Sequence, residues 1–88
     1  MVPAQCRAAR GLLKWSQKDL AQASGFTPLT IRKFENEFGT VRQSTVEEIV
    51  KVFEDAGVIF IGEGDDGPGV RLRKAVRDRV LKERGLLP

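Results

Sequence analysis

Apolar residues recur at helical spacing from the start of the chain. Cys6, Ala9 and Leu13 share one face of a helix that we expect over about 3–13. Pro3 suits the first turn of that helix, because its missing N–H has no intrahelical partner there. The spacing therefore predicts an amphipathic helix that buries the face carrying these three side chains.

A short amphipathic segment follows and ends in a tight turn. It begins at Ser16, whose hydroxyl can cap free backbone amides, and it ends before Gly25, which tolerates the left-handed conformation. Leu20 and Ala23 are its inward candidates, with Ala21 beside them. Because Ala21 is small and Gly25 permits a sharp turn, we expect the next helix to cross closely over this one.

That next helix is predicted over 28–37, where Thr27 provides the cap and Pro28 the first helical residue. Ile31 and Phe34 point inward. At roughly 100° per residue, the opposite side of the helix carries a mostly polar and cationic set. This outward set is Leu29, Arg32, Lys33 and Asn36.

A fourth helix is predicted to begin at Ser44, with Glu47 three residues later completing a capping-box pattern, and to end at Gly57. Its apolar stripe consists of Val46, Ile49, Val50 and Phe53.

Beyond this point the helical pattern stops. Residues 58–61 are β-branched and aromatic, 62–69 have turn chemistry, and 70–73 alternate apolar with basic residues, which predicts a β-hairpin. A lone two-stranded hairpin is marginal in water, so it must pack on its own helices or pair with another chain. Residues 74–84 can form a basic helix with its apolar side chains on one side, namely Val76, Val80 and Leu81.

These elements predict a mainly α fold of four to five helices with a C-terminal β-hairpin and a short C-terminal helix. We expect residues 1–57 to form a helical domain and residues 58–88 to be a basic extension of the same compact unit. The length of 88 residues suits one domain. No apolar run approaches the roughly 20 residues that would cross a bilayer, so we expect a cytoplasmic protein without membrane contact.

Composition argues against catalysis. The chain has no histidine and no tyrosine, which removes the commonest general base and the commonest transition-metal ligand. Cys6 is the single cysteine, so an internal disulfide is impossible, and we expect its thiol to pack in the core. Asp65 and Asp66 lack further ligands at a calcium-binding spacing and indicate a solvated turn. We expect no enzyme activity, no metal and no cofactor.

Charge is distributed unevenly along the chain. Residues 1–53 carry eight Lys/Arg and five Asp/Glu, residues 54–70 carry five acids and no base, and residues 71–88 carry seven bases and two acids. A polyanion such as DNA would therefore meet the two basic ends and avoid the acidic middle.

Residues 7–53 resemble the Cro/C1-type helix-turn-helix family of phage repressors and bacterial transcriptional regulators. The resemblance implies a lambda repressor-like domain whose second short helix reads the major groove. It rests on residues that occur in the family's order and spacing: Arg10, Trp15-Ser16-Gln17, Leu20-Ala21, Gly25, Ile31 and Glu35.

The resemblance also implies roles for individual side chains. Gln17 would bond a phosphate or another base-contacting side chain, Thr27 would touch the DNA backbone, and Arg42 would hold a phosphate. Arg10 and Glu35 would form an internal ion pair. The full set of DNA-binding residues expected in this way is Lys14, Gln17, Thr27, Leu29, Arg32, Lys33, Asn36 and Arg42.

The first positions of the recognition helix depart from the polar residues that the family often carries there. Pro28 and Leu29 donate no side-chain hydrogen bond, although Leu29 can touch a thymine methyl group or serve in packing. Either Arg32 or Lys33 can bond guanine. We therefore expect sparse direct readout and more weight on phosphate contacts and DNA shape.

The expected function is a sequence-specific DNA-binding regulator, a repressor that binds a palindromic, double-stranded DNA operator as a homodimer. The hairpin and the basic C-terminal segment are the expected dimer elements. A second hypothesis is an antitoxin-like module that binds a toxin-like protein partner and also regulates its own promoter.

Overall fold

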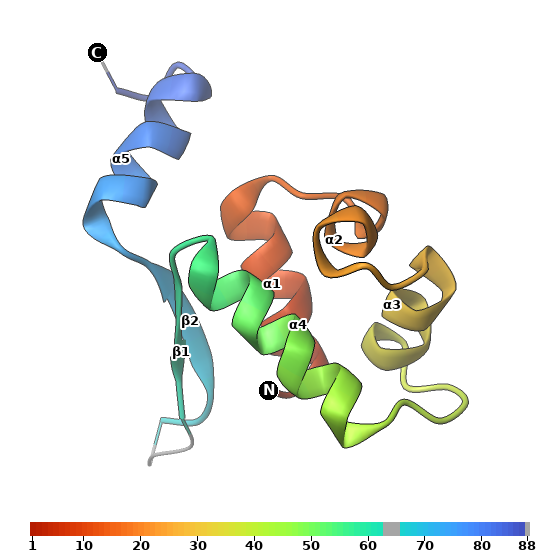
Figure 1. The fold of residues 1–88 in the computed structure, drawn as a ribbon. Helices are drawn as coiled ribbons and strands as arrows, with labels where there is room; N and C mark the ends of the chain where they lie inside the picture. The colour runs from red at the N-terminus through yellow and green to blue at the C-terminus, as the bar shows by residue number, and fades with distance from the viewer. Residues whose placement is uncertain (63–65, 88) are drawn as a thin grey trace.

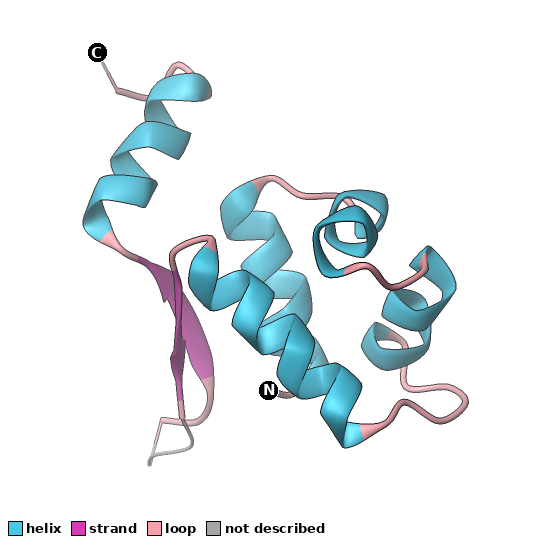
Figure 2. Cartoon of the chain, viewed as in Figure 1, coloured by secondary structure: helices cyan, strands magenta, loops and turns pink. Residues whose placement is uncertain are grey.

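The computed structural model describes residues 1–62 and 66–87, and within these ranges it contains five helices and one two-stranded sheet (Figure 2). The prediction of a mainly helical fold with a C-terminal hairpin and a following helix is confirmed. In chain order the elements are α1 (Pro3–Leu13), α2 (Gln17–Ser24), α3 (Pro28–Glu35), α4 (Gln43–Asp55), β1 (Val58–Ile61), β2 (Gly69–Leu72) and α5 (Lys74–Glu83).

Helices α1 and α4 run through the middle of the molecule (Figure 1). The hairpin lies against one side of this pair, where β2 contacts α1 and β1 contacts α4. Helices α2 and α3 pack together on the other side, α3 touching α1 and α2 touching α4. The helices and the hairpin thus share a single core between them.

The core is built from side chains that the helical spacing placed inward. Its fully buried residues include Leu20, Ile31, Ile49 and Phe53. Trp15, between α1 and α2, stacks on Phe53 with ring centroids 5.9 Å apart. Aromatic pairs of this kind contribute about 0.5–1.5 kcal/mol beyond the area they bury. Trp15 therefore serves as a packing anchor on the core.

Local chemistry fixes the ends of the two short helices. The Ser16 hydroxyl accepts from the Asp19 amide, and the Asp19 carboxylate accepts from the Ser16 amide, which makes a reciprocal cap on α2. Gly25 ends α2 with φ +78°, in the left-handed region. The Thr27 hydroxyl accepts from the Thr30 amide and caps α3.

Three details of the helices differ from the sequence-based expectation. Helix α3 ends at Glu35 rather than at residue 37, because Glu37 has φ +57° and the amide of Phe38 bonds back to the carbonyl of Lys33. The N-cap of helix α4 is Arg42, two residues before the predicted cap Ser44, and the helix has no side-chain cap.

The third difference concerns α2, in which Ala23 is exposed rather than inward. The buried face of this short helix is centred on Leu20, Ala21 and Ser24. Ala23 lies roughly 110° from the centre of that face at 3.6 residues per turn. The prediction for Ala23 was therefore wrong, whereas Leu20 and Ala21 are buried.

The hairpin is antiparallel, with Val58 opposite Leu72 and Phe60 opposite Val70, and these two pairs face the helices. Gln5, buried on α1, fixes its far end: its Nε2 donates to the carbonyls of Ile61 and Gly69 at 3.1 and 2.9 Å. The hairpin therefore packs on its own helices. Asp65 of the predicted turn lies outside the described residues, and Asp66 is exposed.

Helix α5 extends beyond the hairpin (Figure 1). Val80 on its inner side is buried, and the guanidinium of Arg84 donates to the carbonyl of Gly11 at 2.9 Å. This contact ties the end of α5 to the end of α1. Among the described residues, no helix is both long enough and apolar enough to cross a membrane.

Candidate nucleic-acid interface

The α2–turn–α3 unit presents one helix on a support formed by the other. Leu20 and Ala21 of α2 and Ile31 of α3 are buried where the two helices meet, and Phe26 in the turn packs against the same cluster. Because Ala21 has only a methyl side chain, it leaves room for α3 to approach. This packing fixes the inner side of α3 and leaves its outer side to solvent.

A buried carboxylate anchors the C-terminal end of α3. Glu35, the last residue of α3, is 1% exposed. Arg10 of α1 grips both of its oxygens: Nε donates to Oε2 at 2.6 Å and Nη2 donates to Oε1 at 2.7 Å. Gln17 of α2 donates to Oε1 at 3.1 Å, and the Cys6 thiol of α1 donates to Oε2 at 3.2 Å. Three helices thus meet at one side chain.

Two members of this cluster were not expected from the sequence. Cys6 was assigned to core packing alone, yet its thiol donates to Glu35. Arg7 was not singled out, although it donates to the backbone carbonyl of Glu35. The sequence did offer a signal for this cluster, namely an arginine and a cysteine on one side of α1 and an acid on α3. Only the Arg10 pairing was part of the family pattern.

The cluster shifts the ionisation of its members. Burial alone would raise the pKa of Glu35, but hydrogen bonds from Arg10, Gln17 and Cys6 outweigh burial and hold that pKa below its usual value. Hydrogen bonding to Glu35 raises the pKa of Arg10. Burial, assisted by the neighbouring Glu35 carboxylate, raises the pKa of the Cys6 thiol. At neutral pH the cluster therefore holds a carboxylate, a guanidinium and a neutral thiol.

Acid should weaken the fold through Glu35. Since its pKa is lower folded than unfolded, the unfolded chain binds the proton first, and stability present above about pH 4.3 is lost as the pH falls through the folded pKa. We expect the urea midpoint of the wild type to fall between pH 5 and pH 3 by more than that of Glu35→Gln, which cannot ionise. Equal falls in the two proteins would contradict this assignment.

The outer side of α3 combines apolar and cationic side chains. Leu29 and Arg32 are exposed. Lys33 is half-buried, because its methylenes lie against the loop after α3: a Cβ built on Gly39 would sit 3.4 Å from the Lys33 Cδ. Arg32 is therefore the freer of the two cations, and Lys33 leans toward the α3–α4 loop.

The remaining residues expected at the interface surround α2 and α3. Lys14 is exposed at the C-cap of α1, Thr27 is exposed at the start of α3, and Arg42 is exposed at the start of α4. Asn36 is exposed but lies just beyond α3 as its C-cap residue. Gln17 differs from these, since its amide nitrogen is already engaged with Glu35.

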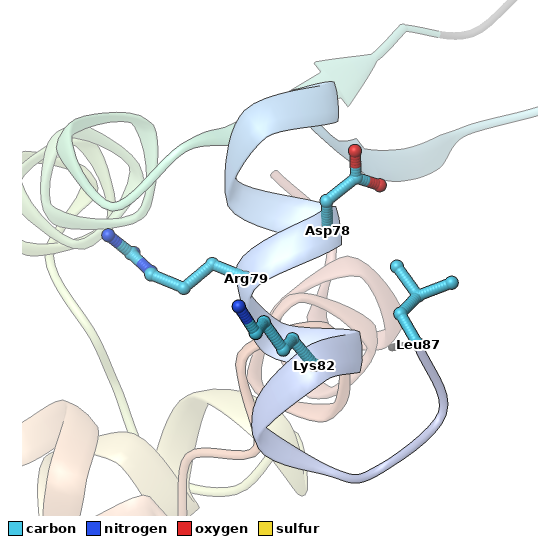
Figure 3. A pocket seen from close by; sticks show the side chains of 4 residues that line it. All are labelled: Asp78, Arg79, Lys82 and Leu87. Carbon is cyan, nitrogen blue, oxygen red and sulfur yellow. The ribbon is translucent and has the colours of Figure 1, made fainter.

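The second basic region does not join this surface. Helix α5 and helix α3 lie at opposite ends of the molecule (Figure 1), so the two basic ends of the chain do not form one continuous surface. An open hollow of about 480 Å³ on α5 is lined by Asp78, Arg79, Lys82 and Leu87 (Figure 3). Across residues 1–62 and 66–87, no group of acidic or cysteine side chains has the arrangement of a metal site.

Comparison with known proteins agrees with this geometry. A family model described as helix-turn-helix matches residues 7–54, which is more than half of the chain; the match begins within α1 and ends within α4. No curated protein matches the chain.

Proposed function

The chain belongs to the Cro/C1-type helix-turn-helix family of DNA-binding transcriptional regulators, and from this premise we propose that it is a repressor. In this proposal the protein binds a palindromic operator as a homodimer. Helix α3 enters the major groove of each half-site, and α2 lies across the DNA backbone.

The observation that carries the proposal is the fixed presentation of α3. Core packing at Ile31 holds its inner side, and the Glu35 cluster holds its C-terminal end to α1 and α2. Its outer side exposes Leu29 and Arg32. A helix held at both its inner side and its end can meet base edges without first being ordered, so little conformational entropy is lost on binding.

The exposed cations divide into two proposed roles. Arg32 projects from the middle of α3 and is suited to donate two hydrogen bonds to guanine O6 and N7. Arg42 and Lys14 stand at the ends of other helices, where they would contact phosphates and set the position of α3 without reading sequence. Thr27 and Lys33 would also contact the backbone.

Two further residues complete the proposed interface. Asn36, just past α3, would reach the DNA beside the groove. Gln17 would donate the second hydrogen of its amide nitrogen to a phosphate while the first remains on Glu35, which would couple backbone contact to the anchor of α3.

Dimerisation is supported by the form of the hairpin. The described sheet has two strands, so each strand keeps one edge without a partner strand. Ile61 at the end of β1 is 42% exposed. Pairing of hairpins across a two-fold axis would cover such an edge and this side chain.

Operator selection tests the proposal directly. The purified chain is incubated with pooled random duplexes, the bound fraction is sequenced, and the enriched site is footprinted. We expect one inverted repeat whose half-sites lie about one helical turn, roughly 34 Å, apart. Enrichment of no motif would refute sequence-specific regulation, and a single unrepeated half-site would refute the dimer.

Substitutions of Arg32 and Arg42 should have different consequences. Arg32→Ala should relax the base preference at one base pair per half-site. The binding free energy should weaken by about 1–3 kcal/mol for sites with the preferred base and stay unchanged for sites without it. Arg42→Ala should weaken all sequences alike and reduce the slope of log affinity against log salt by about 0.9 per phosphate contact. Binding titrations at several salt concentrations, on the operator and a scrambled duplex, measure both effects. Identical profiles for the two variants would contradict the division of roles.

A further inference from the structure

The first turn of α3 has an apolar surface that the core does not use. Pro28 and Leu29 are both exposed, and Leu29 is 45% exposed. Leu29 is absent from the set of side chains packed against the core, which includes its neighbours Phe26 and Phe34. Leu29 therefore does not have the packing role within the protein that the sequence left open.

The polar groups of the same turn are engaged with each other. The Thr27 hydroxyl accepts from the Thr30 amide at 3.2 Å, and the two threonine hydroxyls lie 3.1 Å apart. Pro28 has no amide hydrogen to donate. The side chains of this turn that have no polar partner, Pro28 and Leu29, are apolar.

The surroundings of this tip decide which partner would cover it. Arg32 lies one turn further along the same side of α3, and Lys33 follows it. An apolar spot beside an exposed cation, Arg32, suits a polyanion that carries an apolar group. In the major groove of DNA that group is the 5-methyl group of a pyrimidine.

We propose that Leu29 is a specificity-determining residue that reads the 5-methyl group of a pyrimidine in each half-site. This inference rests on the proposed function, since it requires α3 in the major groove. Thymine and 5-methylcytosine present the same methyl group, so the shared chemistry is the methyl itself. Contact would remove the methyl and the Leu29 side chain from water together, with no hydrogen bond involved.

The test uses the full chain and its selected operator. Each thymine of one half-site is replaced in turn by uracil, which differs only in lacking the methyl group. At one position we expect about a fourfold loss of affinity, which is the free energy of burying one methylene group, ~0.8 kcal/mol, expressed as a ratio. At that position, the affinities for cytosine and for 5-methylcytosine, each opposite guanine, are then compared. A similar gain in affinity for 5-methylcytosine assigns recognition to the methyl group of either base. No gain in affinity restricts recognition to thymine.

Variants assign the effect to a side chain. Leu29→Ala should bind thymine and uracil operators equally, and it should fold normally because Leu29 is exposed. Leu86→Ala, which removes an exposed leucine near the C-terminus, should keep the full loss on uracil substitution. Phe38→Ala tests the exposed aromatic residue after α3, and it should also keep that loss.

The failures are distinguishable. If uracil is tolerated at every position while the operator is still bound specifically, the methyl inference is overturned and the proposed function stands. If Leu29→Ala still discriminates thymine from uracil, or if Phe38→Ala abolishes discrimination, Leu29 is not the reader. If no operator is enriched at all, the proposed function fails and the inference fails with it.

Discussion

Glu35→Ala should lower the free energy of unfolding by about 3–5 kcal/mol, because it leaves the guanidinium of Arg10, whose side chain is only 18% exposed, without its carboxylate. It also removes the acceptor of the Gln17 amide and of the Cys6 thiol. Domains of this size are stable by only about 5–15 kcal/mol, so the loss is a large fraction of the total. Urea denaturation followed by circular dichroism should show a much lower midpoint.

Matched variants separate charge from shape at this position. Glu35→Gln keeps the shape and one acceptor oxygen and should be less destabilising than Glu35→Ala. Replacing both partners, Arg10→Met with Glu35→Leu, should cost less than the sum of the single changes, since neither charge is then buried alone. A Glu35→Ala midpoint within error of the wild type would show that the cluster does not hold α3.

Much of the fold could be predicted because its determinants are local. Ser16, Thr27 and Gly25 mark helix ends through hydrogen bonds and backbone angles that involve neighbours within a few residues. The start of α4 shows the limit of this reasoning. The pattern Ser44 to Glu47 has capping chemistry, but the amides of Thr45 and Val46 both bond to the carbonyl of Arg42, which places the N-cap two residues earlier.

Of the contacts that orient the site, the Arg10–Glu35 ion pair was expected from the family resemblance. The other contacts could not be predicted, because they join distant positions. In the sequence, Gln5 is one polar residue at the margin of α1. In the structure it donates to the carbonyls of Ile61 and Gly69, which lie 56 and 64 residues further along the chain. Cys6 reads as a small core residue, and nothing local indicates that its thiol will face Glu35. The outward set on α3 was predictable from helical geometry, whereas the lean of Lys33 over Gly39 depends on the loop that follows.

Gly57→Ala should also be strongly destabilising, because Gly57 lies where α4, the hairpin and α5 converge. Gly57 has φ +102°, a conformation that residues with a Cβ rarely adopt, and an added Cβ would lie 2.5 Å from Cγ2 of Val76 on α5. Its carbonyl accepts from the Arg73 amide at 2.9 Å, so the backbone has little freedom to move away. Backbone strain of about 1–3 kcal/mol and overpacking of about 1–3 kcal/mol should add.

Two other glycines calibrate these contributions in thermal unfolding. A Cβ added at Gly25 has no atom within 4 Å, and Gly25 has φ +78°. Gly25→Ala should therefore lose only the stability that backbone strain costs. Gly11→Ala lies within α1 in open space and should be stabilising by up to about 1 kcal/mol. In the Val76→Ala background, Gly57→Ala should cost less stability than in the wild type. The contacts with both Cγ atoms of Val76 are then removed, whereas a 3.0 Å contact with its Cβ and the backbone strain remain. A loss of stability for Gly57→Ala no larger than that for Gly25→Ala would mean that α5 does not pack against Gly57. Helix α5 would then be free to change its orientation relative to the hairpin.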